Sequence, residues 1–136
     1  MKIIVDTNIL VRLLVRDDET QFQAVVKLIS DAQEIVIPTH VICELIWVLS
    51  YSYKLKTSAI AEKIKGILNS VKVIINNDEI EAGLLIMEKG GDFADGINAY
   101  TGSVMASDSC VFVSFDKQAV RLFTEEGIPA MVPALR

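Results

Sequence analysis

Short runs of β-branched and aromatic residues alternate with amphipathic helical stripes along this chain, and this alternation restricts its possible folds more than any other feature. It predicts strands over 3–5, 34–38, 71–75, 110–115 and 130–132. It predicts helices over 9–15, 20–32, 39–51, 57–68, 77–88, 92–107 and 117–126, with Thr39 as the cap of the third. Alternating strands and helices are typical of a parallel sheet covered by helices on both faces. We therefore expect an α/β fold of three layers (α/β/α) around a parallel sheet of four to five strands. No repeat or linker interrupts residues 1–136, which predicts a single domain.

The first predicted strand ends in a carboxylate. Ile3, Ile4 and Val5 lead directly into Asp6, and the strand over 110–115 leads in the same way into Asp116. Parallel strands end at the same edge of a sheet, where α/β proteins place their ligands, so the two carboxylates can converge. Like charges in a crevice need compensation, and oxygen ligands select Mg²⁺ or Mn²⁺. The alternative for Asp6 is that it only caps the following helix.

Three further acids stand in unusual contexts. Glu44 lies among apolar residues, where a carboxylate is costly unless it has a partner, although it could also lie on the exposed edge of an amphipathic helix. Asp92 and Asp95 stand three residues apart at a predicted helix start. Capping explains Asp92 and leaves Asp95 without a structural reason. The other 13 of the 18 acidic residues suit solvated faces, loops or a helix cap.

Composition excludes several classes of protein. The net charge of −5 and the pI of about 4.8 argue against a basic surface that binds nucleic acid. The single histidine, His40, cannot build a zinc site, and no glycine-rich phosphate loop is present. Cys43 and Cys110 stand in apolar segments and are expected to be reduced core residues. No apolar run is long enough to span a bilayer and no signal peptide is visible, so we expect a cytoplasmic protein.

Four motifs together resemble one family. They are Val-Asp-Thr-Asn-Ile-Leu at 5–10, the helix carrying Glu44-Leu45, Asp-Phe-Ala-Asp at 92–95 and Ser-Phe-Asp at 114–116. Each alone is weak, but in this order they resemble the PIN-domain ribonucleases, and above all the toxin subunits of VapBC-type toxin–antitoxin pairs. The chain departs from the family pattern at 96–99, Gly-Ile-Asn-Ala in place of an apolar run, and at Ser114, where threonine is common.

The resemblance implies a PIN-like fold, an endoribonuclease that uses Mg²⁺ or Mn²⁺, a toxin role, a small antitoxin partner and a homodimer. It also implies roles for individual residues. The metal-binding and catalytic acids would be Asp6, Glu44, Asp95 and Asp116. Residues that would support them are Asn8, Asp92, Asn98 and Ser114. Apart from the resemblance, four cationic side chains follow these acids and could contact RNA phosphates, with ordinary solvated charge as the alternative for each: Arg12, Arg16, Lys117 and Arg121.

Three other functions are weighed against this one. A receiver-type signalling domain also binds Mg²⁺ through aspartates, but it requires an acid at the end of the third strand, where this chain has Asn76. A domain that only binds partners would have no need of four such acids. A PIN-like nuclease with a housekeeping role in RNA processing remains open.

Overall fold

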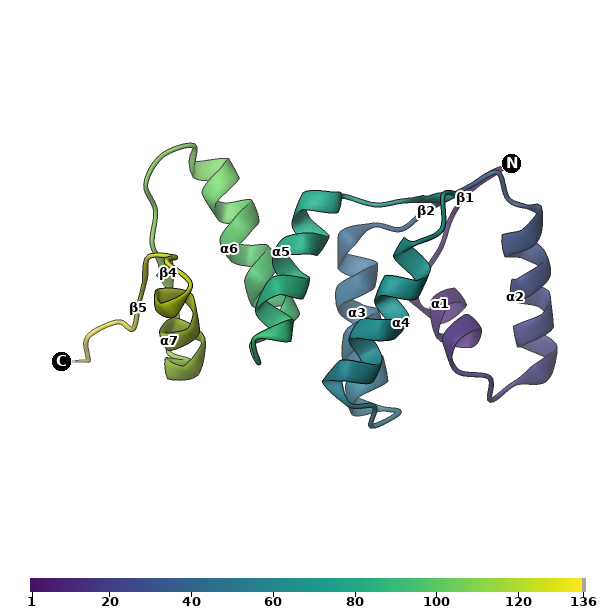
Figure 1. The fold of residues 1–136 in the computed structure, drawn as a ribbon, viewed down its shortest axis with the longest axis horizontal. Coiled ribbons are helices and arrows are strands. Elements are labelled where there is room, and N and C mark those ends of the chain that lie inside the picture. The colour runs from purple at the N-terminus through teal and green to yellow at the C-terminus, as the bar shows by residue number, and fades with distance from the viewer. Residues whose placement is uncertain (136) are drawn as a thin grey trace. The chain divides into compact units, whose positions relative to one another are not determined.

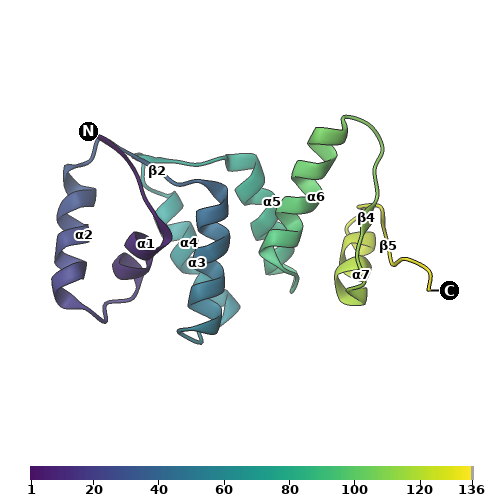
Figure 2. The same ribbon diagram turned by 180° about the vertical axis from the view of Figure 1, so that it is seen from behind.

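The computed structural model describes residues 1–135, whose helices and strands form two compact units, one over 1–76 and one from residue 77 onward (Figures 1 and 2). Each unit contains helices and parallel strands. The α/β class predicted from the sequence is therefore confirmed. No helix among residues 1–135 is both long enough and apolar enough to cross a membrane.

The first unit consists of three strands and four helices. Its elements are β1 (Lys2–Ile4), α1 (Thr7–Leu14), α2 (Glu19–Asp31), β2 (Glu34–Val36), α3 (Thr39–Tyr51), α4 (Thr57–Leu68) and β3 (Val73–Ile74). The strands are parallel in the order β1-β2-β3, with Ile35 of the central strand opposite both Ile3 and Val73. α1 packs on α3, and α3 packs on α4. Leu10, Leu45 and Ile64 are fully buried between these elements.

The second unit carries two strands and three helices. Its elements are α5 (Asn77–Glu88), α6 (Phe93–Ala106), β4 (Phe112–Val113), α7 (Lys117–Glu125) and β5 (Ala130–Met131). α5 and α6 lie side by side. A Cβ atom at Gly96 would come within 2.7 Å of the Ala82 carbonyl oxygen, so glycine permits this close approach. Phe112 and Phe123 meet edge to face with ring centroids 4.5 Å apart, which joins β4 to α7.

The helix bounds agree with the prediction to within two residues. Four of the five strands are shorter than predicted, and β1 has the predicted length but begins one residue earlier. Hydrogen bonding groups the five strands as β1-β2-β3 and β4-β5, both parallel. One predicted cap was wrong. Thr39 is the first residue of α3, and the cap position belongs to Pro38, whose extended backbone ends the strand segment and lets the helix begin at once.

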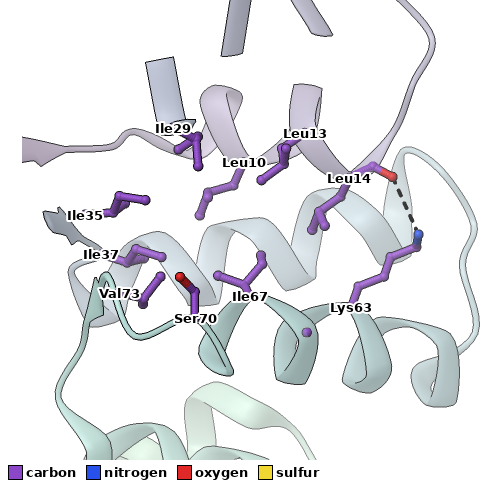
Figure 3. Close-up of a pocket in the computed structure, with 11 residues that line it drawn as sticks. Leu10, Leu13, Leu14, Ile29, Ile35, Ile37, Lys63, Ile67, Ser70 and Val73 are labelled. Atoms are coloured by element: carbon purple, nitrogen blue, oxygen red, sulfur yellow. Dashed lines mark hydrogen bonds between the residues drawn. The ribbon is translucent and has the colours of Figure 1, made fainter. Parts of the chain in front are cut away.

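The first unit also contains an apolar hollow of about 390 Å³. Figure 3 shows side chains of α1, α2 and α4 and of β2 and β3 that line it. At its rim the Lys63 ammonium donates a long hydrogen bond of 3.5 Å to the Leu14 carbonyl oxygen. No acidic side chain lines it, so it is distinct from the acidic residues singled out in the sequence.

Candidate active site

In the first unit, the end of β1 is connected to α3 through one threonine. Asp6 is the N-cap of α1, and its Oδ1 accepts a hydrogen bond of 2.6 Å from the Thr7 amide. The Thr7 hydroxyl donates to Glu44 Oε2 at 2.8 Å. Asp6 therefore caps α1, as the alternative in the sequence analysis proposed. The cap uses Oδ1, so the other carboxylate oxygen of Asp6 could still bind a ligand. Glu44 lies on an exposed face of α3, which is the alternative that the sequence analysis gave for it. The hydrogen bond from Thr7 nevertheless holds its carboxylate in place.

The sequence analysis did not single out Thr7, whose hydroxyl contacts the carboxylate of Glu44. Thr7 is the only buried polar or charged residue of the part of the chain described, residues 1–135. A buried hydroxyl needs a partner, and this one finds it on a helix 37 positions further along the chain. The available signal was a threonine directly after a strand-end aspartate.

In the second unit, two helix N-termini carry the remaining acids. Asp92 is the N-cap of α6, and its Oδ1 accepts from the Asp95 amide at 3.0 Å. Asp116 is the N-cap of α7, and its Oδ1 accepts from the amides of Gln118 at 3.0 Å and Ala119 at 3.1 Å. Partial positive charge at a helix N-terminus stabilises carboxylates in these positions. Asp116 is therefore a helix N-cap, as Asp92 is, and the sequence analysis did not predict this role for Asp116.

These acids share one pocket of about 480 Å³ within the second unit. Its lining residues are Lys89, Gly90, Gly91, Asp92, Asp95, Asp116, Gln118, Ala119, Arg121 and Leu122. Burial raises the pKa of the Asp95 carboxyl, and the negative charges of Asp92 and Asp116 raise it further. The pocket thus gathers like charges around a partly buried carboxyl, an arrangement that a bound cation would relieve.

Of the four cationic residues expected to contact RNA, only Arg121 lines this pocket. Arg12 pairs with Asp17 at 2.9 Å. Arg16 binds Glu19 through two nitrogens, at 2.6 and 2.8 Å, and holds the pKa of that carboxyl at about 2. These ion pairs occupy both arginines of the first unit. Lys117 is exposed at the start of α7.

The supporting residues named from the sequence lie in different places. The Ser114 hydroxyl accepts a hydrogen bond of 3.0 Å from the Asp116 amide, so it acts on the backbone rather than on the carboxylate. Asn8 is exposed on α1. Asn98 lines a separate pocket in the second unit, together with Ser103, Cys110 and Phe112.

The donor chemistry fits a hard divalent cation. Asp6 and Glu44 of the first unit and Asp95 and Asp116 of the second offer carboxylate oxygens alone, which is the ligand type of Mg²⁺ and Mn²⁺. Within residues 1–135 no three His, Cys, Asp or Glu side chains are grouped so that they could hold a metal ion. Carboxylate chemistry and the like charges around Asp95 are the features that suit a cation, and residues 1–135 show no formed metal site.

Comparison with known protein families matched residues 3–122 to the PIN domain. A comparison with curated proteins gave no match. The family match covers all seven helices of residues 1–135 in whole or in part, and it includes Asp6, Glu44, Asp95 and Asp116. The chain belongs to the PIN domain family, whose fold is of the nuclease type.

Proposed function

We propose that this protein is a metal-dependent endoribonuclease that acts as the toxin of a toxin–antitoxin pair. The observation that carries the nuclease assignment is the acidic pocket, where Asp95 is partly buried beside Asp92 and Asp116 and has a raised pKa. The fold uses Asp92 and Asp116 as helix N-caps, and a cation-dependent reaction would use these two charges together with that of Asp95. Membership of the PIN domain family supports the same assignment.

Asp6, Glu44, Asp95 and Asp116 would hold Mg²⁺ or Mn²⁺. The ion would supply a water of lowered pKa for in-line attack on phosphorus and would stabilise charge on the phosphate oxygens. We propose that residues 1–136 act as one nuclease domain.

The side chains of the site have separate tasks. Asp6 and Asp116 are fixed by backbone amides at the starts of α1 and α7, which limits their rotamers before any ligand binds. Thr7 orients Glu44 through its hydroxyl. Arg121 stands in the acidic pocket, where its guanidinium can pair with a phosphate oxygen. With a net charge of −5, the protein would bind RNA through few such contacts.

The toxin role, a small antitoxin partner, a homodimer and a cytoplasmic location belong to the same proposal. Their support is the resemblance of the four motifs to VapBC-type toxins. A nuclease that attacks cellular RNA would harm its host, so a partner that covers the acids is expected.

The test is cleavage of a labelled single-stranded RNA with Mg²⁺, with Mn²⁺ and with EDTA. Cleavage is expected with either metal and not with EDTA, and double-stranded DNA of the same length should stay largely intact. The matched control is Asp116→Asn, which should be inactive. Undiminished cleavage in EDTA would refute the metal mechanism.

The toxin role has its own test. Induced expression of the wild-type chain in a bacterial host should stop growth, and the same level of Asp116→Asn should not. Unimpaired growth with an active wild-type enzyme in the cell would favour the housekeeping role in RNA processing.

A further inference from the structure

One side of α3 carries an exposed row of polar and aromatic residues. His40, Glu44, Trp47 and Tyr51 are spaced by four, three and four positions, which places them on one helix face. Trp47 is 59% exposed and Tyr51 is 62% exposed. Their ring centroids lie 5.1 Å apart with the planes tilted by 30°. Two large rings therefore stand open to solvent on the face that carries the acid Glu44.

Other aromatic rings of the first unit have polar partners. Phe22 lies under the Arg16 guanidinium, 4.2 Å from its ring centroid, and the Tyr53 hydroxyl donates to Asp17 at 3.1 Å. Trp47 and Tyr51 instead contact each other. Exposing the apolar surface of a tryptophan and a neighbouring tyrosine to water costs free energy, and such exposed pairs commonly form binding surfaces.

We propose that Trp47 and Tyr51 form a platform on which nucleobases of the RNA substrate stack, beside the phosphate that is cleaved. The inference rests on the proposed nuclease function, because it takes Glu44 as part of the active site. At a rise of about 1.5 Å per residue, Trp47 lies about 4.5 Å and Tyr51 about 10.5 Å along the helix axis from Glu44. These rings are placed to meet the nucleotides that flank the scissile bond.

Stacking suits an acidic protein. Every base offers a π-face, so a ring can bind RNA without a net positive charge, and the net charge of this chain is −5. The faces of paired bases are covered in a duplex and open in a single strand, so the platform would select single-stranded RNA.

Trp47 is the only tryptophan of the 136 residues, so its fluorescence reports on this platform alone. The experiment titrates the full chain in EDTA, where no metal-dependent cleavage occurs, with a single-stranded RNA of 12 nucleotides. Quenching of Trp47 is expected. An oligonucleotide of equal length with sugars and phosphates but no bases should not quench. Equal quenching by both would overturn the proposal, because phosphate contact would then suffice.

Variants measure what the rings contribute. Affinity for the labelled RNA, read by anisotropy, should fall by about 5- to 150-fold in Trp47→Ala, the range expected for the loss of one stack. Trp47→Phe keeps a ring and should lose much less, which separates stacking from misfolding. The matched control is Met105→Ala, an exposed apolar residue of α6, which should bind as wild type does. Unchanged affinity in Trp47→Ala would refute the platform.

Two further readouts separate this inference from its alternatives. If Mg²⁺-dependent cleavage occurs but RNA does not quench Trp47, the platform is wrong and the nuclease stands. If RNA is neither bound nor cleaved, the proposed nuclease function is refuted, and the platform is refuted with it. If dilution of the protein alone shifts the Trp47 emission to the red, the rings lie between two copies of the chain and the proposal is overturned.

Discussion

Replacing Asp116 by Asn tests whether this acid serves the reaction or only the fold. Its Oδ1 caps α7 through the amides of Gln118 and Ala119. Asparagine caps a helix about as well as aspartate, so Asp116→Asn keeps these bonds and removes one negative charge near Asp95. Asp116→Ala removes the cap as well, at a cost of about 1 kcal/mol. The pair of variants therefore separates charge from capping.

The expected shifts follow from the size of the chain. With an unfolding entropy of about 2.1 cal/mol/K per residue, a loss of 1 kcal/mol lowers the Tm of this protein by about 3–4 °C. In EDTA, Asp116→Asn should melt near wild type, because relief of the repulsion on Asp95 offsets the lost attraction to the start of α7. Asp116→Ala should melt about 3–4 °C lower than Asp116→Asn.

Metal should separate wild type from both variants. At a hundredfold excess over its dissociation constant, Mg²⁺ stabilises a folded site by about 2.7 kcal/mol, which corresponds to about 9 °C in this chain. Wild type should show most of this gain, and Asp116→Asn and Asp116→Ala much less. The assay is a thermal melt with EDTA and with Mg²⁺, paired with RNA cleavage. If Asp116→Asn melts well below wild type in EDTA and still cleaves RNA, Asp116 is structural and its assignment as a ligand is wrong.

Three other changes test separate contacts. Thr7→Val removes the hydroxyl that positions Glu44; cleavage should fall at least tenfold while circular dichroism shows an intact fold, and full activity would remove Thr7 from the site. Asp95→Asn should stabilise the metal-free protein at neutral pH, because burial and nearby acids raise the native pKa of Asp95. This advantage should be absent below the ordinary pKa of 3.8 and grow as pH rises past it, and denaturant unfolding at several pH values measures it. The Glu19 carboxyl should titrate at about 2 in carbon NMR and return toward 4.5 in Arg16→Gln, so its stabilising effect is present above 4.5 and lost as pH falls toward 2.

The sequence predicted the helices well because their signals are local. The apolar spacing along each helix and the glycines at 90, 91 and 127 are read without knowledge of distant partners. Strand lengths depend on pairing with other strands, and the predicted run over 110–115 keeps only Phe112–Val113 as a strand. The turn that follows is set by Ser114, whose hydroxyl accepts from the Asp116 amide.

Three acids that the sequence singled out share one pocket of the second unit, namely Asp92, Asp95 and Asp116, whereas the contacts that support the acids were not predicted. Acids in apolar segments or at strand–helix junctions could be singled out because a carboxylate is costly there unless it has a partner. Thr7 did not stand out, since its hydrogen bond to Glu44 joins positions 37 residues apart. The ion pairs of Arg12 and Arg16 were also not foreseen, because a surface arginine is equally compatible with a phosphate and with a neighbouring acid.

The caps at Asp6, Asp92 and Asp116 have a consequence for inheritance. A codon for aspartate becomes one for asparagine by a single base change, and asparagine fills an N-cap equally well. In the proposed toxin, such a change at Asp6 or Asp116 would abolish cleavage and leave the folded surface intact. A silenced copy of the gene would then still encode a chain that binds the antitoxin, and in a cell with both copies it would compete for that partner and free the active one.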